Sequence, residues 1–242
     1  MNMLKLNLLL KQLFFIGLLI FKFNLGISQN VENLKLLASN GDSIAQFNLA
    51  RAYFKGEDVK KDNSLAYYWF EKSALKGIKE SQYYLGIFYH DGIGIKKNLP
   101  KSFYWIDKSA NNGDTDAQAF LSYLYEYGYG VKKNLQKSFL WLQKSAKNGN
   151  ITAQFNLGSY YYAKEGVENK KKAFIWYEKS AKLNQADAQY HLGIMYLNGE
   201  YVAINKQNAA YWLNKAYLSK TSISEVAKEY LDNYKLWKYI SK

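Results

Sequence analysis

The stretch Tyr68-Trp69-Phe70-Glu71-Lys72-Ser73-Ala74 decides the fold, because close relatives of it return four more times along the chain. The tryptophans at the centre of these stretches are spaced 36, 36, 35 and 36 residues apart, and they are Trp69, Trp105, Trp141, Trp176 and Trp212. A fixed period in this range is typical of a stacked repeat array, in which each unit contacts only its neighbours. The sequence therefore predicts one continuous all-α solenoid.

Each repeat is expected to contain two helices. The first carries a small residue, a leucine and a tyrosine at positions i, i+4 and i+8, which lie on one face of an α-helix; in the first repeat these are Ala45, Leu49 and Tyr53. The residue after the leucine is Ala, Gly, Ser, Gly and Gly in the five repeats, and so small a side chain lets another helix approach closely. The second helix contains the tryptophan and ends after Lys-Ser-Ala.

Residues with defined capping chemistry predict the helix boundaries. An Asp or Asn stands seven residues before each repeat tryptophan, and we expect these to be the N-caps of the second helices: Asp62, Asn98, Asn134, Asn169 and Asn205. The N-caps expected for first helices are Asp42, Asp114 and Asn150, and the residues expected to end second helices are Gly77, Gly113, Gly149 and Asn184. Pro100 falls in a first turn, where its missing N–H costs little. The Gly-x-Gly loops lack the preceding strand that a phosphate-binding loop requires.

The first 28 residues differ from the rest of the chain. They carry Lys5, Lys11 and Lys22 but no acidic residue, and an apolar run fills positions 13–21. This run is short for a membrane span and is typical of a signal peptide, with cleavage expected after Ser28. The sequence thus predicts export to the periplasm or secretion. An uncleaved membrane anchor is the alternative.

The domain organisation follows from these patterns. A cap helix at residues 29–41 and a capping helix at 221–242 are expected to cover the open ends of the array, because a terminal repeat would otherwise expose an apolar face. The predicted segments are the signal peptide at 1–28, the cap at 29–41, repeats at 42–77, 78–113, 114–149, 150–184 and 185–220, and the final cap at 221–242.

The recurring pattern resembles the Sel-one-like repeat family, a relative of the tetratricopeptide repeats. The resemblance rests on a small residue before Gln, then Leu-Gly, Tyr, Gly-x-Gly-Val and Trp followed by Lys-Ser-Ala, over about residues 42–220. It implies antiparallel helix pairs stacked into a right-handed superhelical solenoid of about five helix-turn-helix repeats. It also implies an adaptor or scaffold for protein–protein interaction, often in bacterial envelopes or host-facing proteins.

The residue types that catalysis requires are scarce. The chain contains no cysteine, which excludes disulfides and thiolate chemistry, and it contains only two histidines, His90 and His191, in different repeats. No Gly-x-Ser-x-Gly motif is present. The sequence therefore predicts a protein that is not an enzyme, with no cofactor and no metal site.

The repeat tryptophans are interpreted as packing residues, because a ligand site would not recur in every unit. Truncating one to Ala is expected to cost roughly 3–5 kcal/mol of stability. Partner-binding residues are expected instead beside the conserved leucines, on the concave face formed by the first helices. These candidates are Phe47, Arg51, Tyr83, Ile87, His90, Ala119, Tyr123, Phe155, Ser159, Tyr162, Tyr190 and Ile194. Filling of the core between repeats is the alternative role for each of them.

Paired lysines recur at equivalent loop positions and are expected to align as a basic ridge. They are Lys60, Lys61, Lys96, Lys97, Lys132, Lys133, Lys170 and Lys171. With a formal net charge of +13, such a ridge could attract an acidic partner or an anionic envelope surface. Lysines that merely keep the array soluble are the alternative.

The sequence predicts an exported, non-enzymatic scaffold that binds a protein or peptide, whose identity it does not specify. One alternative is an envelope enzyme or glycan-binding protein acting on cell-wall material, although no acid/base pair supports it. The other is a basic nucleic-acid binder, which would require retention in the cytoplasm, so no nucleic acid is expected as a partner of an exported chain.

Overall fold

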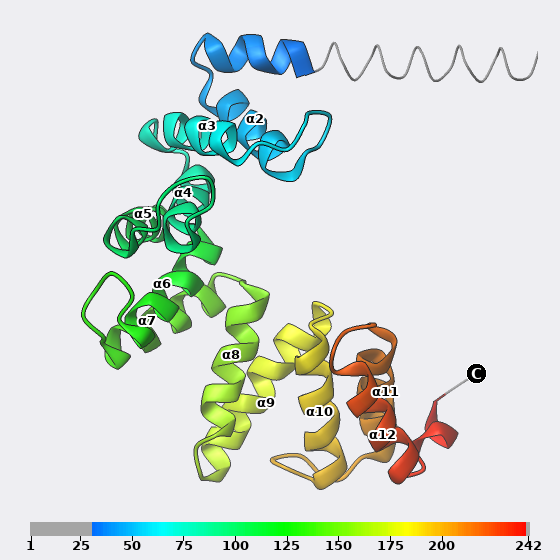
Figure 1. Ribbon diagram of the computed structural model, residues 1–242. Coiled ribbons are helices and arrows are strands. Elements are labelled where there is room, and N and C mark those ends of the chain that lie inside the picture. Colours follow the sequence, from blue (N-terminus) through cyan, green and yellow to red (C-terminus); the bar gives the residue numbers. More distant parts are fainter. Residues whose placement is uncertain (1–30, 241–242) are drawn as a thin grey trace, which may run out of the picture. The chain divides into compact units, whose positions relative to one another are not determined.

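The computed structural model describes residues 31–240, and every regular element in that range is helical, which confirms the all-α solenoid class (Figure 1). The described chain begins with helix over residues 31–39. The first helices of the repeats are α2 (Ser43–Lys55), α4 (Lys79–Asp91), α6 (Thr115–Tyr127), α8 (Ile151–Tyr162) and α10 (Ala186–Asn198). The second helices are α3 (Asn63–Leu75), α5 (Leu99–Asn111), α7 (Leu135–Lys147), α9 (Val167–Lys182) and α11 (Lys206–Leu218).

These helices belong to two compact units that divide between Asn112 and Gly113. The N-terminal unit holds α2 to α5 and the C-terminal unit holds the elements from α6 onward. In both units the two helices of a repeat pack against each other as a pair.

Capping side chains start the helices largely where the sequence places them. Asp62, Asn98, Asn134 and Asn205 each accept a hydrogen bond from a backbone N–H in the first turn of a second helix. Asp42, Asp114 and Asn150 do the same for first helices, as expected. These side chains satisfy N–H groups that have no partner within the helix. Capping residues in the sequence therefore determine where most of these short helices begin.

Asn169 is a correction, because it is not an N-cap. Helix α9 begins at Val167 after Gly166, whose φ of 98° lies in the left-handed region, so Asn169 lies inside the helix. There its Nδ2 donates to the Glu165 carbonyl oxygen at 2.7 Å. The fourth repeat lacks one loop residue, and the glycine leads directly into a longer helix.

In four of the five repeats the residue after the tryptophan, rather than the tryptophan itself, fills the space between the two helices. In the third repeat the corresponding Leu142 is only half-buried. Phe70, Ile106 and Leu213 are fully buried, and Tyr177 is nearly so. Each faces the small residue that follows the conserved leucine. A methyl group added to Gly158 would lie 2.7 Å from Cδ1 of Tyr177. The same addition would come equally close to Ile106 in the second repeat and to Leu213 in the fifth.

The tryptophans of four repeats pack against the helix that precedes their repeat, and they are Trp69, Trp105, Trp176 and Trp212. Trp69 lies against Ala38, Ala45 and Leu49, and so contacts both the preceding helical segment and its own first helix. Trp105 is buried, whereas the other four repeat tryptophans are half-buried. Packing between the two helices of one repeat therefore depends mainly on the residue that follows the tryptophan.

Buried glutamines in four of the repeats link each of these repeats to the helix before it. The Nε2 atoms of Gln46, Gln82, Gln154 and Gln189 donate to the carbonyl oxygens of Ala38, Ala74, Ala146 and Ala181 at 3.0–3.2 Å. The buried serine of Lys-Ser-Ala adds a bond within the repeat; Ser145 Oγ, for example, donates to the Thr115 carbonyl at 2.7 Å. Because these groups are buried, each unmade bond would cost about 1–3 kcal/mol.

The C-terminal cap is not one continuous helix. Helix α12 (Ser224–Asn233) stops before Lys235, whose φ of 52° lies in the left-handed region, and a 3₁₀ helix follows at Leu236–Tyr239. Ala227, Leu231 and Leu236 are fully buried in one cluster with residues of α11. The kink allows both short elements to cover the last repeat.

Gly158→Ala is expected to destabilise the protein by about 1–3 kcal/mol, because its methyl group would overlap the rigid Tyr177 ring. Helix propensity alone predicts the opposite sign, a gain of about 1 kcal/mol. Urea unfolding measures the difference. Asn156→Ala, at an exposed position of the same helix, is the control and should be neutral or stabilising; a gain for both variants would contradict the packing.

Leu183→Asn is expected to stabilise the protein by about 0.5–1.5 kcal/mol. Asn112 and Asn148 donate to the Oε1 atoms of Gln82 and Gln118 at 2.9 and 3.0 Å. In the fourth repeat Leu183 takes the equivalent place, and Gln154 Oε1 is buried without a hydrogen-bond partner among residues 31–240. Thermal unfolding should show a higher midpoint for Leu183→Asn and a lower one for the reciprocal Asn148→Leu. If the thermal midpoint changes in neither variant, the hydrogen bond to the glutamine does not stabilise the protein.

Candidate functional site: an aromatic cluster in the C-terminal unit

Aromatic side chains from α8, α9 and α10 meet around a stacked pair. The rings of Tyr177 and His191 lie 5.1 Å apart and 8° from parallel. Phe155 and Tyr162, both on α8, lie 5.8 and 6.1 Å from the Tyr177 ring. Tyr177 is buried because it is the residue after Trp176 and faces Gly158, while the other three remain half-buried. The close helix approach thus brings the aromatic side chains together.

The cluster continues toward the C-terminal cap. Tyr190 contacts His191 at 5.3 Å and the Tyr230 ring of α12 at 5.6 Å. Tyr230 in turn stacks on Tyr234 at 5.8 Å. Aromatic pairs in such geometries contribute about 0.5–1.5 kcal/mol beyond the area they bury. The result is a partly exposed aromatic surface that extends over the last two repeats and the cap.

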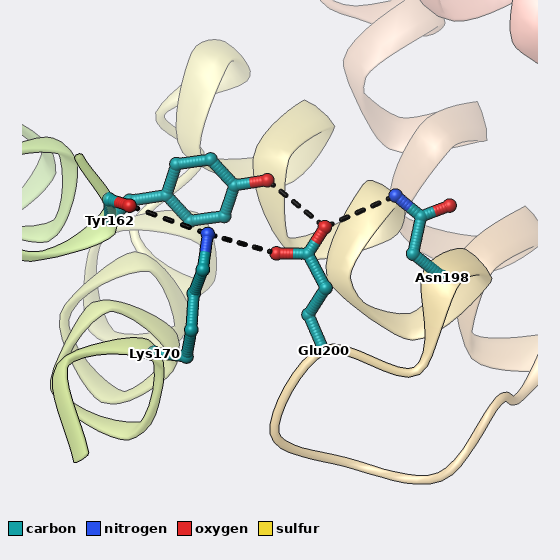
Figure 2. Close-up of polar contacts among 4 residues, drawn as sticks. All are labelled: Tyr162, Lys170, Asn198 and Glu200. Atoms are coloured by element: carbon teal, nitrogen blue, oxygen red, sulfur yellow. Dashed lines mark hydrogen bonds and ion pairs between the residues drawn. The ribbon is translucent and has the colours of Figure 1, made fainter. Parts of the chain in front are cut away.

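Glu200 lies next to Tyr162 of the cluster and has polar contacts with Tyr162, Lys170 and Asn198, as Figure 2 shows. Its Oε1 accepts hydrogen bonds from Tyr162 Oη at 3.0 Å and from Asn198 Nδ2 at 3.1 Å. Its Oε2 forms an ion pair with Lys170 Nζ at 3.3 Å. The same ammonium group donates to the Tyr162 carbonyl oxygen at 3.3 Å and lies 3.3 Å from the centre of the Tyr162 ring. One lysine thus joins α9 to α8 and to the loop after α10.

The surroundings shift the pKa values of Tyr162, Tyr177, His191 and Glu200. Burial raises the pKa values of Tyr162 and Tyr177 to about 12. Burial lowers the pKa of His191, so the neutral imidazole is favoured beside Tyr177. Burial alone would raise the pKa of Glu200, but the bonds from Asn198, Tyr162 and Lys170 outweigh it and the pKa is lowered. At neutral pH the cluster therefore contains neutral rings and one internal ion pair.

The arrangement is suited to binding rather than to acid–base chemistry. Glu200 is engaged by three partners, and His191 is stacked on a tyrosine ring with its charged form disfavoured. His90 lies in the N-terminal unit, where its Nδ1 contacts Asp91 Oδ1 at 2.6 Å. Within residues 31–240, no three His, Cys, Asp or Glu side chains are placed to hold a metal ion. No helix in the same range has the length and apolar character needed to cross a membrane.

The predicted binding residues fall into separate groups. Phe155, Ser159, Tyr162 and Tyr190 join the cluster, Ser159 by accepting a bond from Tyr177 Oη at 3.2 Å. Ile194 packs beside the C-terminal core. Tyr123 contacts Phe120, Tyr127 and Tyr129, and Ala119 packs beside Ala146 and Leu157. The remaining candidates belong to the N-terminal unit, and they are Phe47, Arg51, Tyr83, Ile87 and His90.

A second aromatic group, in the N-terminal unit, surrounds Phe47. Its ring lies 6.1 Å from Phe70 and 6.2 Å from Tyr84, and the Arg51 guanidinium lies 5.6 Å from it. Tyr84 stacks on Phe70 at 4.8 Å and 7°. Phe47 is half-buried, as Phe155 is in the C-terminal cluster.

Sequence reasoning missed Tyr177, His191, Glu200 and Tyr230. Tyr177 could have been found, because it occupies the position after the tryptophan where the other repeats have Phe, Ile or Leu. His191 precedes the conserved leucine, a position whose identity varies among the repeats. Glu200 and Tyr230 lie outside the repeat pattern, which gives no signal for them.

The predicted basic ridge needs one correction. Lys60, Lys61, Lys96, Lys97, Lys132, Lys133 and Lys171 are exposed. Lys170 is not, because the early start of α9 turns it toward Glu200 and Tyr162. The second lysine of each loop pair also lies close to a left-handed glycine; a methyl group on Gly56 would lie 3.2 Å from Cβ of Lys61.

Comparison with known proteins places the repeats in a described family. The Sel1 repeat model matches residues 43–78, 79–114, 115–150, 151–185 and 186–219. A protective antigen of uropathogenic Escherichia coli strains, displaying an SLR fold, is 32% identical with a TM-score of 0.78 over 89% of this chain and 48% of that one. A Sel1 repeat protein from Oxalobacter formigenes is 27% identical with a TM-score of 0.78 over 86% of this chain and 59% of that one.

A curated relative matches over a short range. A putative sel1-like repeat-containing protein of Acanthamoeba polyphaga mimivirus is 49% identical over 43 residues, which is 18% of this chain and 7% of that protein. The chain therefore spans about half the length of the E. coli antigen and a small part of the viral protein.

His191→Phe is expected to make stability less dependent on pH just below neutrality. The folded pKa of His191 lies below its unfolded value of 6.5, so its contribution to stability is present above pH 6.5 and is lost as the pH falls toward the folded pKa. Thermal midpoints measured at pH 7.5 and 5.5 should differ less for the variant than for the native protein. Glu200 titrates in a more acidic range and should not mask the difference. An equal drop in both proteins would contradict the burial of His191.

Proposed function

Because the chain belongs to the Sel1 repeat family, we propose that it is a repeat scaffold that binds a protein partner through the first helices of its C-terminal unit. The fold supports a scaffold role, since Sel1 repeat proteins are generally non-enzymatic and bind other proteins. The proposal assigns no catalytic step to the chain.

The partly exposed aromatic cluster on α8 and α10 carries the proposal. Phe155, Tyr162, Tyr190 and His191 are half-buried, so each presents part of a ring at the surface while the rest is fixed by neighbours. Rigid aromatic side chains lose little conformational entropy on binding and are common anchors at protein interfaces. A helix or an extended peptide with apolar side chains is the partner that fits this surface.

The charge of the first helices also indicates which kind of partner can bind there. Helices α6, α8 and α10 contain no lysine or arginine, and Lys170 beside them is already paired with Glu200. An acidic partner would therefore gain no free cation from these helices, which argues for an apolar contact at this site instead. Acidic groups would be attracted to the lysines of the second helices and loops.

We also propose that the protein is exported. Export is supported by the basic and apolar pattern of residues 1–28, which lie outside the described residues. An exported scaffold would meet its partner in the envelope or outside the cell.

A photo-reactive phenylalanine analogue in place of Tyr160 is expected to cross-link a defined protein in the native cell. Tyr160 is an exposed residue of α8, next to the cluster, so the fold should tolerate the change. Tyr104, exposed on the second helix α5, is the matched control site. The adduct should be identified by mass spectrometry and should disappear when Phe155→Ala is added, with helicity retained. Adducts from Tyr104 alone would assign binding to the second helices and overturn the proposal.

A further inference from the structure

The second helices of the C-terminal unit expose the same set of side chains in every repeat. The residue before the tryptophan is apolar and exposed: Leu140 is 62%, Ile175 39% and Tyr211 51% exposed. The residue three positions after the tryptophan is always lysine, and its ammonium group lies over the indole ring. Lys144 is 4.4 Å from the Trp141 ring, Lys179 is 4.4 Å from Trp176 and Lys215 is 5.6 Å from Trp212.

These sets lie next to one another across α7, α9 and α11. Trp176 of α9 packs against Ala146 of α7, and Trp212 of α11 packs in the same cluster as Ala181 of α9. Because Leu140, Ile175 and Tyr211 precede the tryptophans at equivalent positions, they form a row along the layer of second helices. We call Leu140, Ile175, Tyr211, Lys144, Lys179 and Lys215 the outer row.

Charge in this unit is strongly segregated between the two helices of a repeat. Helices α7, α9 and α11 contain ten lysines and two glutamates, whereas α6, α8 and α10 contain no lysine or arginine. The two glutamates pair within α9, Glu168 with Lys172 and Glu178 with Lys182. None of the three lysines of the outer row has an ion pair within residues 31–240. The outer row thus combines unneutralised positive charge with exposed apolar side chains.

We propose that the outer row binds an anionic lipid surface. Lysine can place its aliphatic stem among apolar groups while its ammonium reaches lipid phosphates, and Trp and Tyr favour the boundary between headgroups and acyl chains. Exposed Leu140 and Ile175 would insert at that boundary, which adds apolar burial to the electrostatic attraction. The lysines of the row thus neutralise the lipid charge and the apolar residues hold the contact.

The chemistry of the row favours lipid over nucleic acid. Base recognition relies heavily on arginine, which forms two parallel hydrogen bonds, and the single arginine of the chain is Arg51 in the other unit. Exposed aliphatic residues gain little from a sugar–phosphate backbone, whereas they gain from burial in acyl chains. The row also lies on helices other than α8 and α10, so lipid binding does not depend on the proposed protein contact.

Cosedimentation of the full chain with vesicles tests the proposal. Vesicles of phosphatidylcholine with 30% phosphatidylglycerol should bind the protein at low salt, and binding should fall at high salt. Each lysine at such a surface contributes roughly five-fold in affinity, so the triple variant Lys144→Gln, Lys179→Gln, Lys215→Gln should bind about 100-fold more weakly. The matched control is Lys60→Gln, Lys61→Gln, Lys96→Gln, which removes the same charge from exposed loops of the N-terminal unit and should change binding much less.

A site-specific probe separates the outer row from residues 1–30, which could themselves contact lipid. The chain has no cysteine, so Leu140→Cys can be labelled alone with a polarity-sensitive dye. Its emission should shift to the blue on anionic vesicles and stay unchanged on phosphatidylcholine alone. Asn156→Cys, exposed on α8, is the matched control and should not respond. Any of three results would overturn the proposal. These are an equal loss of binding in both triple variants, an equal emission shift at both labelled sites, and the same emission shift at Leu140→Cys with duplex DNA.

Discussion

The close approach of the two helices in each repeat is the constraint on which the structure depends. A residue without a bulky side chain follows the conserved leucine, and the residue after the tryptophan fills the space that this leaves. At Gly158 the contact with Tyr177 leaves no room for a methyl group. Protein interiors are packed nearly as densely as organic crystals, so such a contact fixes the distance between the helices within narrow limits. The tryptophan is then free to pack against the preceding repeat, and its outer edge lies beneath a lysine.

Polar bonds determine how one repeat follows the next. The buried glutamines reach back to a backbone carbonyl of the preceding second helix, and a glutamine can make this bond only when the two repeats are in register. The fourth repeat departs from the pattern by one loop residue. There α9 starts early, Lys170 turns to Glu200, and the aromatic cluster forms where Tyr177 meets His191. The irregular start of α9 thus brings Lys170 to Glu200 at the side of the cluster that we propose for binding.

Much of the fold could be predicted from the sequence because the period is fixed and capping chemistry is local. Asp62, Asn98, Asn134 and Asn205 begin helices as expected, since an N-cap depends on only the next three residues. Asn169 could not be placed correctly, because the deleted loop residue changed which backbone conformation leads into the helix. The ring contacts between the helices of the aromatic cluster join residues 14 to 40 positions apart, and the repeat pattern does not specify them. Only Tyr177 could have been recognised from the sequence, because it places a large polar ring at a packing position where the other repeats have Phe, Ile or Leu.

A double-mutant cycle between Gly158 and Tyr177 tests most directly whether this contact sets the helix spacing. Gly158→Ala adds a methyl group to the contact, and Tyr177→Ala removes the ring that this methyl group would meet. The free energy of unfolding would be measured by urea denaturation for the native chain, both single variants and the double variant. We expect the double variant to be more stable than the sum of the single effects by about 1–3 kcal/mol, because removal of the ring leaves space for the methyl group. Strictly additive effects would contradict the account.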